Sequence, residues 1–148
     1  MDVSDAGVAA ELRDLQRRAY RIEAELIGSD EIPPLRETLA ELQACGETFL
    51  VARDPSGALA GAISWRVDGP VIDLHRLVVD PAWFRRGVGS ALVRAALASE
   101  PGVERAVVQT GAANAPAIAL YRREGFQPSG ELEPVPGLRV ARFVKLLG

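Results

Sequence analysis

The sequence has few of the residues on which several kinds of chemistry depend. Its 148 residues hold one lysine (Lys145) beside 16 arginines, one cysteine (Cys45) and one histidine (His75). A single cysteine excludes an internal disulfide. Because there is also only one histidine, any zinc site would need mostly carboxylate ligands, which is unusual for zinc. A single lysine near the C-terminus argues against Schiff-base chemistry and against a Walker-type phosphate loop. We therefore expect no bound metal.

Long apolar runs and an excess of basic charge are lacking too. No apolar run approaches the roughly 20 residues that a membrane-spanning helix needs. The opening residues, MDVSDAGVAAE, lack the basic and apolar regions of a signal peptide. The net charge of −3 is unlike that of nucleic-acid-binding proteins, which carry a basic excess. We predict a cytoplasmic protein of one domain that binds small molecules and neither nucleic acid nor membrane.

The hydrophobic pattern predicts a mixed α/β domain. Apolar residues at spacings of three and four indicate a helix over residues 8–27, and a proline start with a glycine end indicates a second over 33–46. An Asp-Pro-Ser-Gly turn within residues 47–67 predicts a hairpin of two strands. The further predicted elements are a strand over 71–79, a helix over 88–99, a strand over 103–110, a helix over 115–124 and a strand over 137–147.

The turn before the predicted helix at 88–99 holds two arginines and two glycines: Arg85, Arg86, Gly87 and Gly89. Without Cβ atoms, the glycines let backbone N–H groups approach a ligand. The first amides of the helix have no intrahelical partner and carry the positive end of its dipole. A pyrophosphate would fit such a site, with the arginines adding charge. The alternative is a tight turn with solvated arginines.

A second segment, TGAANAPAIALYRREGF (110–126), places an asparagine before a predicted helix and a tyrosine near its end. Taken alone, Asn114 is typical of a helix cap. Taken alone, Tyr121 is typical of a core aromatic whose hydroxyl binds the backbone.

Taken together, the two segments resemble the GNAT superfamily of N-acetyltransferases. Its Q/R-x-x-G-x-G/A segment, which binds the pyrophosphate of acyl-CoA, is matched at both glycines by FRRGVG (84–89). Phe84 departs from the family, which has Gln or Arg at that position. The resemblance covers residues 47–147. The later family motif, Asn-x-x-Ala-x-x-Leu-Tyr followed by Gly-Phe, is matched at Asn114, Ala117, Leu120, Tyr121, Gly125 and Phe126.

The resemblance implies a fold and a cofactor. The expected fold is a single GNAT domain over residues 1–148, with a mixed, mostly antiparallel central sheet splayed near its fourth strand and helices on both faces. Residues 1–7 are expected to be disordered, and 8–46 to form two helices on the substrate side. The implied substrates are acetyl-CoA and an amine, and homodimers occur in the family. The cofactor-binding residues that match are Val78, Val79, Arg85, Arg86, Gly87, Val88, Gly89, Ser90, Asn114 and Tyr121.

The resemblance also implies direct attack of the amine on the thioester. Tyr121 matches the usual general acid, because a phenol stays protonated at neutral pH and is able to protonate a leaving thiolate. The base is left open between Asp73, His75 and water. Asp73 stands where some members carry a glutamate, and His75 lies two residues on, about 7 Å away on the same strand face. Each is alternatively a polar residue on an open face.

Two other functions are compatible with these residues. A domain that had lost catalysis would be an acyl-CoA-binding sensor or interaction module, and the departure at Phe84 is compatible with that. A nucleotide-binding domain would bind ATP or NAD at the glycine turn, but the sequence lacks the lysine and the third glycine of those motifs.

Overall fold

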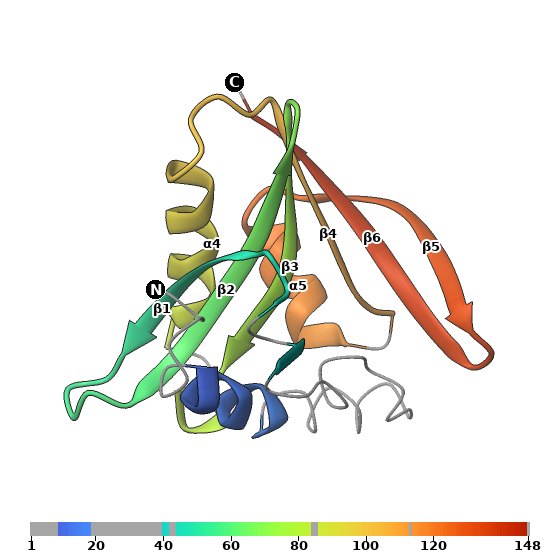
Figure 1. Cartoon of the computed structure of the whole chain (residues 1–148). Coiled ribbons are helices and arrows are strands. Elements are labelled where there is room, and N and C mark those ends of the chain that lie inside the picture. The colour runs from blue at the N-terminus through green and yellow to red at the C-terminus, as the bar shows by residue number, and fades with distance from the viewer. Residues whose placement is uncertain (1–8, 19–39, 42–43, 84–85, 113, 148) are drawn as a thin grey trace.

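A six-stranded sheet runs through the part of the chain that the computed structural model describes, residues 9–18, 40–41, 44–83, 86–112 and 114–147 (Figure 1). Its spatial order is β1-β2-β3-β4-β6-β5. Neighbouring strands are antiparallel except β3 and β4, which are parallel, so the predicted mixed sheet is confirmed. The strands are β1 (Thr48–Arg53), β2 (Leu59–Asp68), β3 (Val71–Val79), β4 (Arg105–Gly111), β5 (Gln127–Val135) and β6 (Leu138–Leu146).

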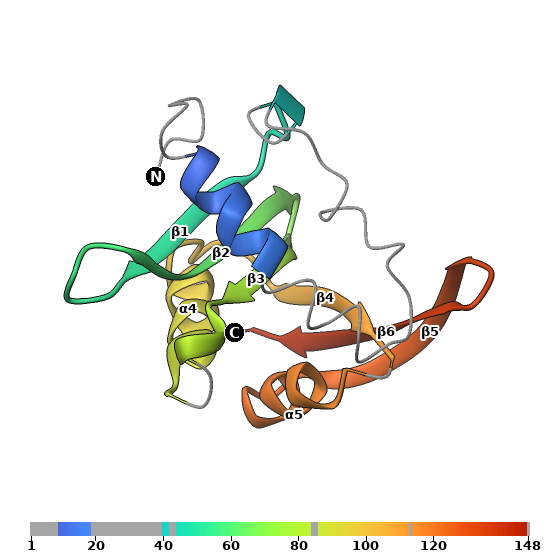
Figure 2. The same cartoon turned by 90° about the horizontal axis from the view of Figure 1, so that it is seen from below.

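Helices cover both faces of the sheet, as predicted (Figure 2). A helix over residues 9–18 lies on one face, and α4 (Val88–Ala98) and α5 (Ala115–Arg123) lie on the other. A short 3-10 turn, η1 (Pro81–Trp83), follows β3. No helix in the described ranges is both long and apolar enough to cross a bilayer. The rest of the predicted helix 8–27, and most of the one at 33–46, lie outside the described residues.

Each face of the sheet has its own apolar cluster. Under the helix at 9–18, Leu12 and Leu15 pack with Phe49 and Val78. The larger cluster, on the other face, joins the sheet to α4 and α5; it includes Ile63, Trp65, Ile72, Leu74, Leu92, Val93, Ala96, Val108, Tyr121 and Phe126.

The strand β5 is absent from the sequence-based prediction. Pro128 and Pro134 interrupt it, and proline donates no hydrogen bond to a sheet. It forms because it lies at the edge of the sheet and pairs only with β6. Its pairing shifts register between Pro128 and Gly130 and again between Leu132 and Val135, so irregular pairing accommodates both prolines.

The sheet opens between its two parallel strands. Pairing of β3 with β4 runs only from Val71↔Arg105 to Leu74↔Val108. Beyond Leu74, β3 pairs with β2 alone, while β4 continues beside β6 alone. The two strands therefore diverge toward their carboxyl ends, as Figure 1 shows. The predicted splay is confirmed, and it lies between β3 and β4.

Candidate functional site

The opening begins at a β-bulge that contains His75. In the pairing of β2 with β3, Ser64 faces Arg76 and Trp65 faces Leu74, so His75 is an extra residue with no partner across the ladder. Leu74 belongs to the cluster below α4, whereas Val78 belongs to the cluster under the helix at 9–18. A regular strand would put both on one face, so the bulge reverses the alternation. Bulges redirect side chains in this way beside many active sites.

The bulge brings the predicted bases together with a third acidic side chain. The Nε2 atom of His75 lies 3.3 Å from Oδ2 of Asp73, and Nδ1 lies 3.5 Å from Oε2 of Glu47. The Asp73 side chain is 48% exposed and that of His75 31%, while that of Glu47 is only 6% exposed. In the described part of the chain, no group of three or more histidine, cysteine or acidic side chains is arranged to hold a metal ion.

Glu47 was missed by the sequence analysis, although it is the most firmly held of the three. Its Oε1 accepts hydrogen bonds from Ser64 Oγ at 2.5 Å and from Arg76 Nε at 2.9 Å, and its Oε2 accepts one from the Arg76 guanidinium at 3.3 Å. Arg76 also donates to Gln16 Oε1 at 2.9 Å, which ties the helix at 9–18 to the cluster. One feature of the sequence pointed toward such a residue: Arg76 stands at an inward position of an aliphatic strand, and a buried arginine needs a buried acidic partner.

The charge on Glu47 is stabilised by these contacts. Burial alone would raise the pKa of its carboxyl group. The hydrogen bonds from Arg76 and Ser64, with the charges of Arg76 and His75, outweigh that effect and hold the pKa below its ordinary value. Glu47 is therefore an anion throughout the neutral pH range.

The N-terminus of α4 meets the requirements of an anion site. Gly87 caps the helix in the left-handed conformation, with φ 79°, and no side chain caps the first turn. The first intrahelical bond runs from Ala91 N–H to the Gly87 carbonyl, so the amides of Val88, Gly89 and Ser90 have no partner within the helix. The first turn holds no acidic residue. A Cβ built on Gly87 would meet nothing within 4 Å, so the approach to the turn is open.

Arg86 lies beside this turn, with its guanidinium carbon 5.1 Å from the centroid of the Trp83 ring. The side chain of Arg86 is therefore directed by an aromatic face, an arrangement typical of a cation–π contact. Arg85 and Phe84 lie outside the described residues.

In the structure, a glycine is needed at position 89 for a different reason from the one that the sequence suggested. A Cβ on Gly89 would lie 2.7 Å from Leu120 Cδ1, closer than such atoms pack, and 3.8 Å from Val79 Cγ2. Gly89 is buried, and the absence of its Cβ lets α4 pack against α5. Of the two glycines in this turn, Gly87 is the one with free space beside it for a ligand.

Val78 and Val79 lie on the part of β3 that β4 does not pair, opposite Ala62 and Gly61 of β2. This is the position that the family resemblance implies for cofactor contact. The side chain of Val78 is buried under the helix at 9–18. On the side that faces β4, the backbone groups of Val78 and Val79 do not pair with a strand.

Asn114 and Tyr121 both have the structural roles that their types suggest. Asn114 Oδ1 accepts a hydrogen bond from Ala117 N–H at 3.2 Å and so caps α5, and its Nδ2 lies 3.4 Å from Thr110 Oγ1. Tyr121 is 4% exposed, and its ring meets Phe126 edge-on at a centroid distance of 5.6 Å. The helix-cap interpretation of Asn114 and the core position of the Tyr121 ring are thus confirmed. The cofactor-binding and acid roles stay predictions.

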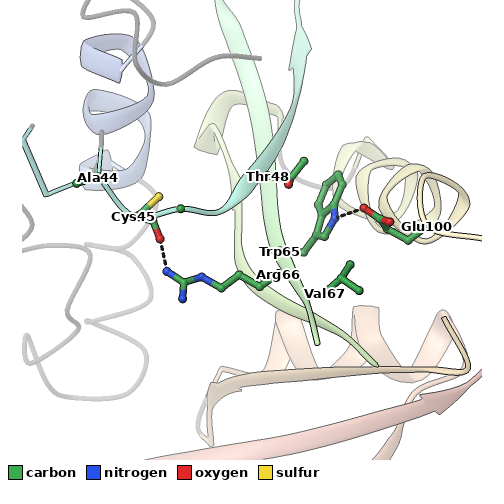
Figure 3. A pocket seen from close by; sticks show the side chains of 8 residues that line it. Ala44, Cys45, Thr48, Trp65, Arg66, Val67 and Glu100 are labelled. Atoms are coloured by element: carbon green, nitrogen blue, oxygen red, sulfur yellow. Dashed lines mark hydrogen bonds between the residues drawn. The ribbon is translucent and has the colours of Figure 1, made fainter. Parts of the chain in front are cut away.

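A separate groove of about 530 Å³ lies where β1 and β2 meet the C-terminal end of α4 (Figure 3). Inside it, Trp65 Nε1 donates to Glu100 Oε1 at 3.1 Å, and Arg66 donates to the carbonyl oxygen of Cys45. None of the predicted site residues lines it, so it does not belong to the candidate site. Its lining residues are Ala44, Cys45, Gly46, Thr48, Trp65, Arg66, Val67 and Glu100.

Comparison with known proteins agrees with this geometry. The sequence pattern of the Acetyltransferase (GNAT) family matches residues 9–126. The UPF0157 protein YqkA of Bacillus subtilis (strain 168) is 36% identical over 139 residues, which are 94% of this chain and 40% of YqkA. The N-alpha-acetyltransferase RimI of Mycobacterium tuberculosis (strain ATCC 25618 / H37Rv) is 34% identical over 135 residues, 87% of this chain and 83% of RimI.

A solved structure shows the same fold. The PaiA N-acetyltransferase from Thermoplasma acidophilum, in complex with coenzyme A, matches with a TM-score of 0.71 and 17% identity. The match covers 99% of this chain and 96% of that chain. The chain spans less than half the length of some of the curated relatives that it matches, YqkA among them. From the family pattern and the splayed sheet together, we conclude that the chain belongs to the GNAT family of acetyltransferases.

Proposed function

We propose that the chain is an acetyl-CoA-dependent N-acetyltransferase that transfers an acetyl group to a primary amine. The observation that carries this proposal is the opening between β3 and β4, which lies between a helix N-terminus without a side-chain cap and an imidazole flanked by carboxylates. Family membership supports the reaction, and the coenzyme A in the PaiA complex supports the donor.

The first turn of α4 is suited to the pyrophosphate of acetyl-CoA. The amides of Val88, Gly89 and Ser90, which have no partner within the helix, supply donors, and the helix dipole favours negative charge there. Arg86 adds a positive charge beside the turn. With the pyrophosphate held there, the pantetheine arm would enter the opening beside Val78 and Val79, where β3 is paired with β2 but no longer with β4.

The chemistry needs the substrate ammonium to lose two protons and the leaving thiolate to gain one. The substrate ammonium first gives a proton to His75, and the neutral amine then attacks the thioester carbonyl carbon. As the tetrahedral intermediate collapses, the carbon–sulfur bond breaks and the thiolate takes a proton from the Tyr121 hydroxyl. The attacking nitrogen then loses its second proton, which returns through water to the Tyr121 phenolate, so that one proton in total is released through His75. Asp73, in contact with His75 and half-exposed, provides a route by which the proton on His75 reaches solvent.

The experiment that tests the proposal compares the wild type with Tyr121→Phe. Calorimetric titration should show that both bind acetyl-CoA, and that ATP and NAD do not bind. Thiol release with a panel of amines should show that the variant loses about 100-fold or more in kcat, because the leaving thiolate lacks its acid.

Three other outcomes would each contradict part of the proposal. If Tyr121→Phe kept the wild-type kcat, the role assigned to the hydroxyl would be wrong. A wild type that bound acetyl-CoA but acetylated no amine would be an acyl-CoA-binding module. If neither acetyl-CoA nor coenzyme A bound, the assignment of the α4 turn would be refuted altogether.

A further inference from the structure

We propose that Glu47 is a positioning residue, which holds the His75 imidazole in the tautomer and orientation of a base at the opening of the sheet. This inference rests on the proposed function. The observation behind it is that Oε2 of Glu47 lies 3.5 Å from Nδ1 of His75, with the opposite ring nitrogen, Nε2, on the side of Asp73.

Glu47 is suited to orient a neighbour because it is itself fixed. Its carboxylate is buried, and Ser64 Oγ and two nitrogens of Arg76 all donate to it. Arg76 is buried as well, with its guanidinium carbon 5.9 Å from the centroid of the Phe49 ring and another nitrogen bonded to Gln16. A carboxylate with three donors in a buried setting has little freedom to turn. Its Oε2 is therefore a fixed acceptor beside His75.

His75, by contrast, has weak support from its own strand. It is the extra residue of the bulge, and its side chain is 31% exposed. Its other charged contact, Asp73, is 48% exposed and so is free to move and is solvated. Of the two carboxylates, the buried one interacts more strongly because solvent screens it less.

The contact has a chemical consequence. If Nδ1–H donates to Glu47, the lone pair of His75 is placed on Nε2, where it is able to accept a proton from the substrate ammonium. The imidazolium that results then lies between the carboxylates of Glu47 and Asp73, which stabilise its charge. A buried acid that orients a catalytic histidine works by the same logic in serine proteases.

The competing explanation is that Glu47 only neutralises Arg76. Both explanations predict that Glu47→Gln lowers stability, so stability does not separate them. The tautomer does. In Glu47→Gln, the amide oxygen would accept from Ser64 and Arg76, as Oε1 does now, which would turn the NH2 group toward Nδ1 of His75. That group donates rather than accepts, so it would favour the tautomer with the proton on Nε2.

The first test is nitrogen NMR of the imidazole, without any acceptor substrate. Because His75 is the chain's only histidine, its ring signals need no residue assignment. The two nitrogens are told apart by their couplings, since Nε2 couples to both ring C–H protons and Nδ1 mainly to Hε1. In the wild type above the pH at which the ring is protonated, we expect the Nδ1–H tautomer, and in Glu47→Gln the Nε2–H tautomer. The same tautomer in both proteins would overturn the proposal, whether or not the chain proves to be an acetyltransferase.

The second test is a double-mutant cycle in kcat with Glu47→Gln and His75→Asn. We expect Glu47→Gln to lower kcat about 10- to 100-fold, within the range of general-base effects. The KM for acetyl-CoA should stay within about twofold, because the side-chain contacts of Glu47 are with Ser64, Arg76 and His75, none of which is assigned to the α4 turn. In the His75→Asn background, Glu47→Gln should lower kcat no further.

A matched control is Glu124→Gln, which alters another buried carboxylate held by an arginine, Arg94, at 2.7 Å. It should lower the melting temperature but leave kcat at saturating acetyl-CoA unchanged. Its KM for acetyl-CoA is not part of the control, because Glu124 also hydrogen-bonds Ser90 in the α4 turn. Equal losses from Glu47→Gln in both backgrounds would mean a merely structural role and would overturn the inference. An active His75→Asn enzyme with wild-type kcat would also overturn it and would leave the proposed transferase intact. A wild type without activity would instead refute the proposed function, and the NMR test would still decide the contact.

Discussion

Replacing Gly89 with alanine tests why α4 begins with a glycine inside its first turn. The added Cβ would lie 2.7 Å from Leu120 Cδ1, well inside contact distance, and 3.8 Å from Val79 Cγ2, an ordinary contact. Leu120 is half-buried and packs against the main core cluster on the α5 side, so its side chain has limited room to move away. The substitution therefore overpacks one contact between α4 and α5.

Two effects of opposite sign set the magnitude. Overpacking costs about 1–3 kcal/mol, and alanine is favoured over glycine in a helix by about 1 kcal/mol. The net loss of stability is about 1 kcal/mol, which lowers the melting temperature by about 3 °C for a chain of this size. In a Leu120→Ala background the obstructing atom is gone. In that background only the higher helix propensity of alanine over glycine acts, so Gly89→Ala should stabilise the protein by about 1 kcal/mol.

The assay is urea unfolding of the wild type, the two single variants and the double variant. Gly87→Ala is the control, because a Cβ there meets nothing within 4 Å but the residue has φ +79°. Its cost of about 1–2 kcal/mol should be the same with and without Leu120. If Gly89→Ala changed stability equally in both backgrounds, steric packing on Leu120 would be refuted. Unchanged stability with weaker acetyl-CoA binding would instead mean that Gly89 leaves room for the ligand.

Two further predictions concern arginine contacts. Trp83→Leu removes the ring beside Arg86, a cation–π contact worth about 0.5–1 kcal/mol. Titration should show that the Kd for acetyl-CoA rises about two- to fivefold in Trp83→Leu and stays at the wild-type value in Trp83→Phe. If Trp83→Leu raised the Kd equally in an Arg86→Met background, the ring would not act through Arg86. Hydrogen bonds from Arg94 lower the pKa of Glu124 from its ordinary 4.5, outweighing burial. The stabilisation that the ionised Glu124 gives to the folded state is present above pH 4.5 and is lost as the pH falls through the lower pKa of the folded state. The free energy of unfolding of Glu124→Gln should lack this loss in acid. If it fell with pH as steeply as that of the wild type, the prediction would be wrong.

Most of the elements could be predicted because their signals are local. The strand over 71–79 was predicted with both of its ends correct, and the helix that follows it with its start correct. The hairpin turn at Asp54 lies where it was predicted, and Asp54 Oδ1 accepts hydrogen bonds there from the backbone N–H of Ser56 and Ala58. The strand β5 could not be predicted because its prolines are compatible with pairing only at an edge, and edge position is a property of the whole sheet.

The motif residues were found, but local patterns did not reveal their roles. The sequence suggested one role for both glycines of the turn, which was to let backbone amides approach a ligand. In the structure, Gly87 provides a left-handed cap and Gly89 provides room for Leu120. Leu120 itself lies in the other matched motif, beside Tyr121. The two motifs of the family are therefore also a packing pair, which only the placement of α5 against α4 reveals.

The bulge was invisible in the sequence for a physical reason. Both faces of β3 are covered, so buried aliphatic residues occur on either side of His75, and skipping a residue leaves no gap in the pattern. Arg76 was the one informative residue, because a buried guanidinium requires an acidic partner. The chain offers 20 acidic residues, and sequence distance does not choose among them.

The sheet makes that choice. Phe49 pairs with Ser64, and Ser64 pairs with Arg76, so the start of β1 lies two strands away from Arg76 on the same face. Glu47, two residues before Phe49, reaches across Ser64 to the guanidinium, and its remaining oxygen faces the bulge. A charge needed to bury Arg76 is thereby placed beside His75. The stability of the sheet and the orientation of its only histidine depend on one carboxylate, so a variant that keeps the fold while changing the tautomer separates the two roles.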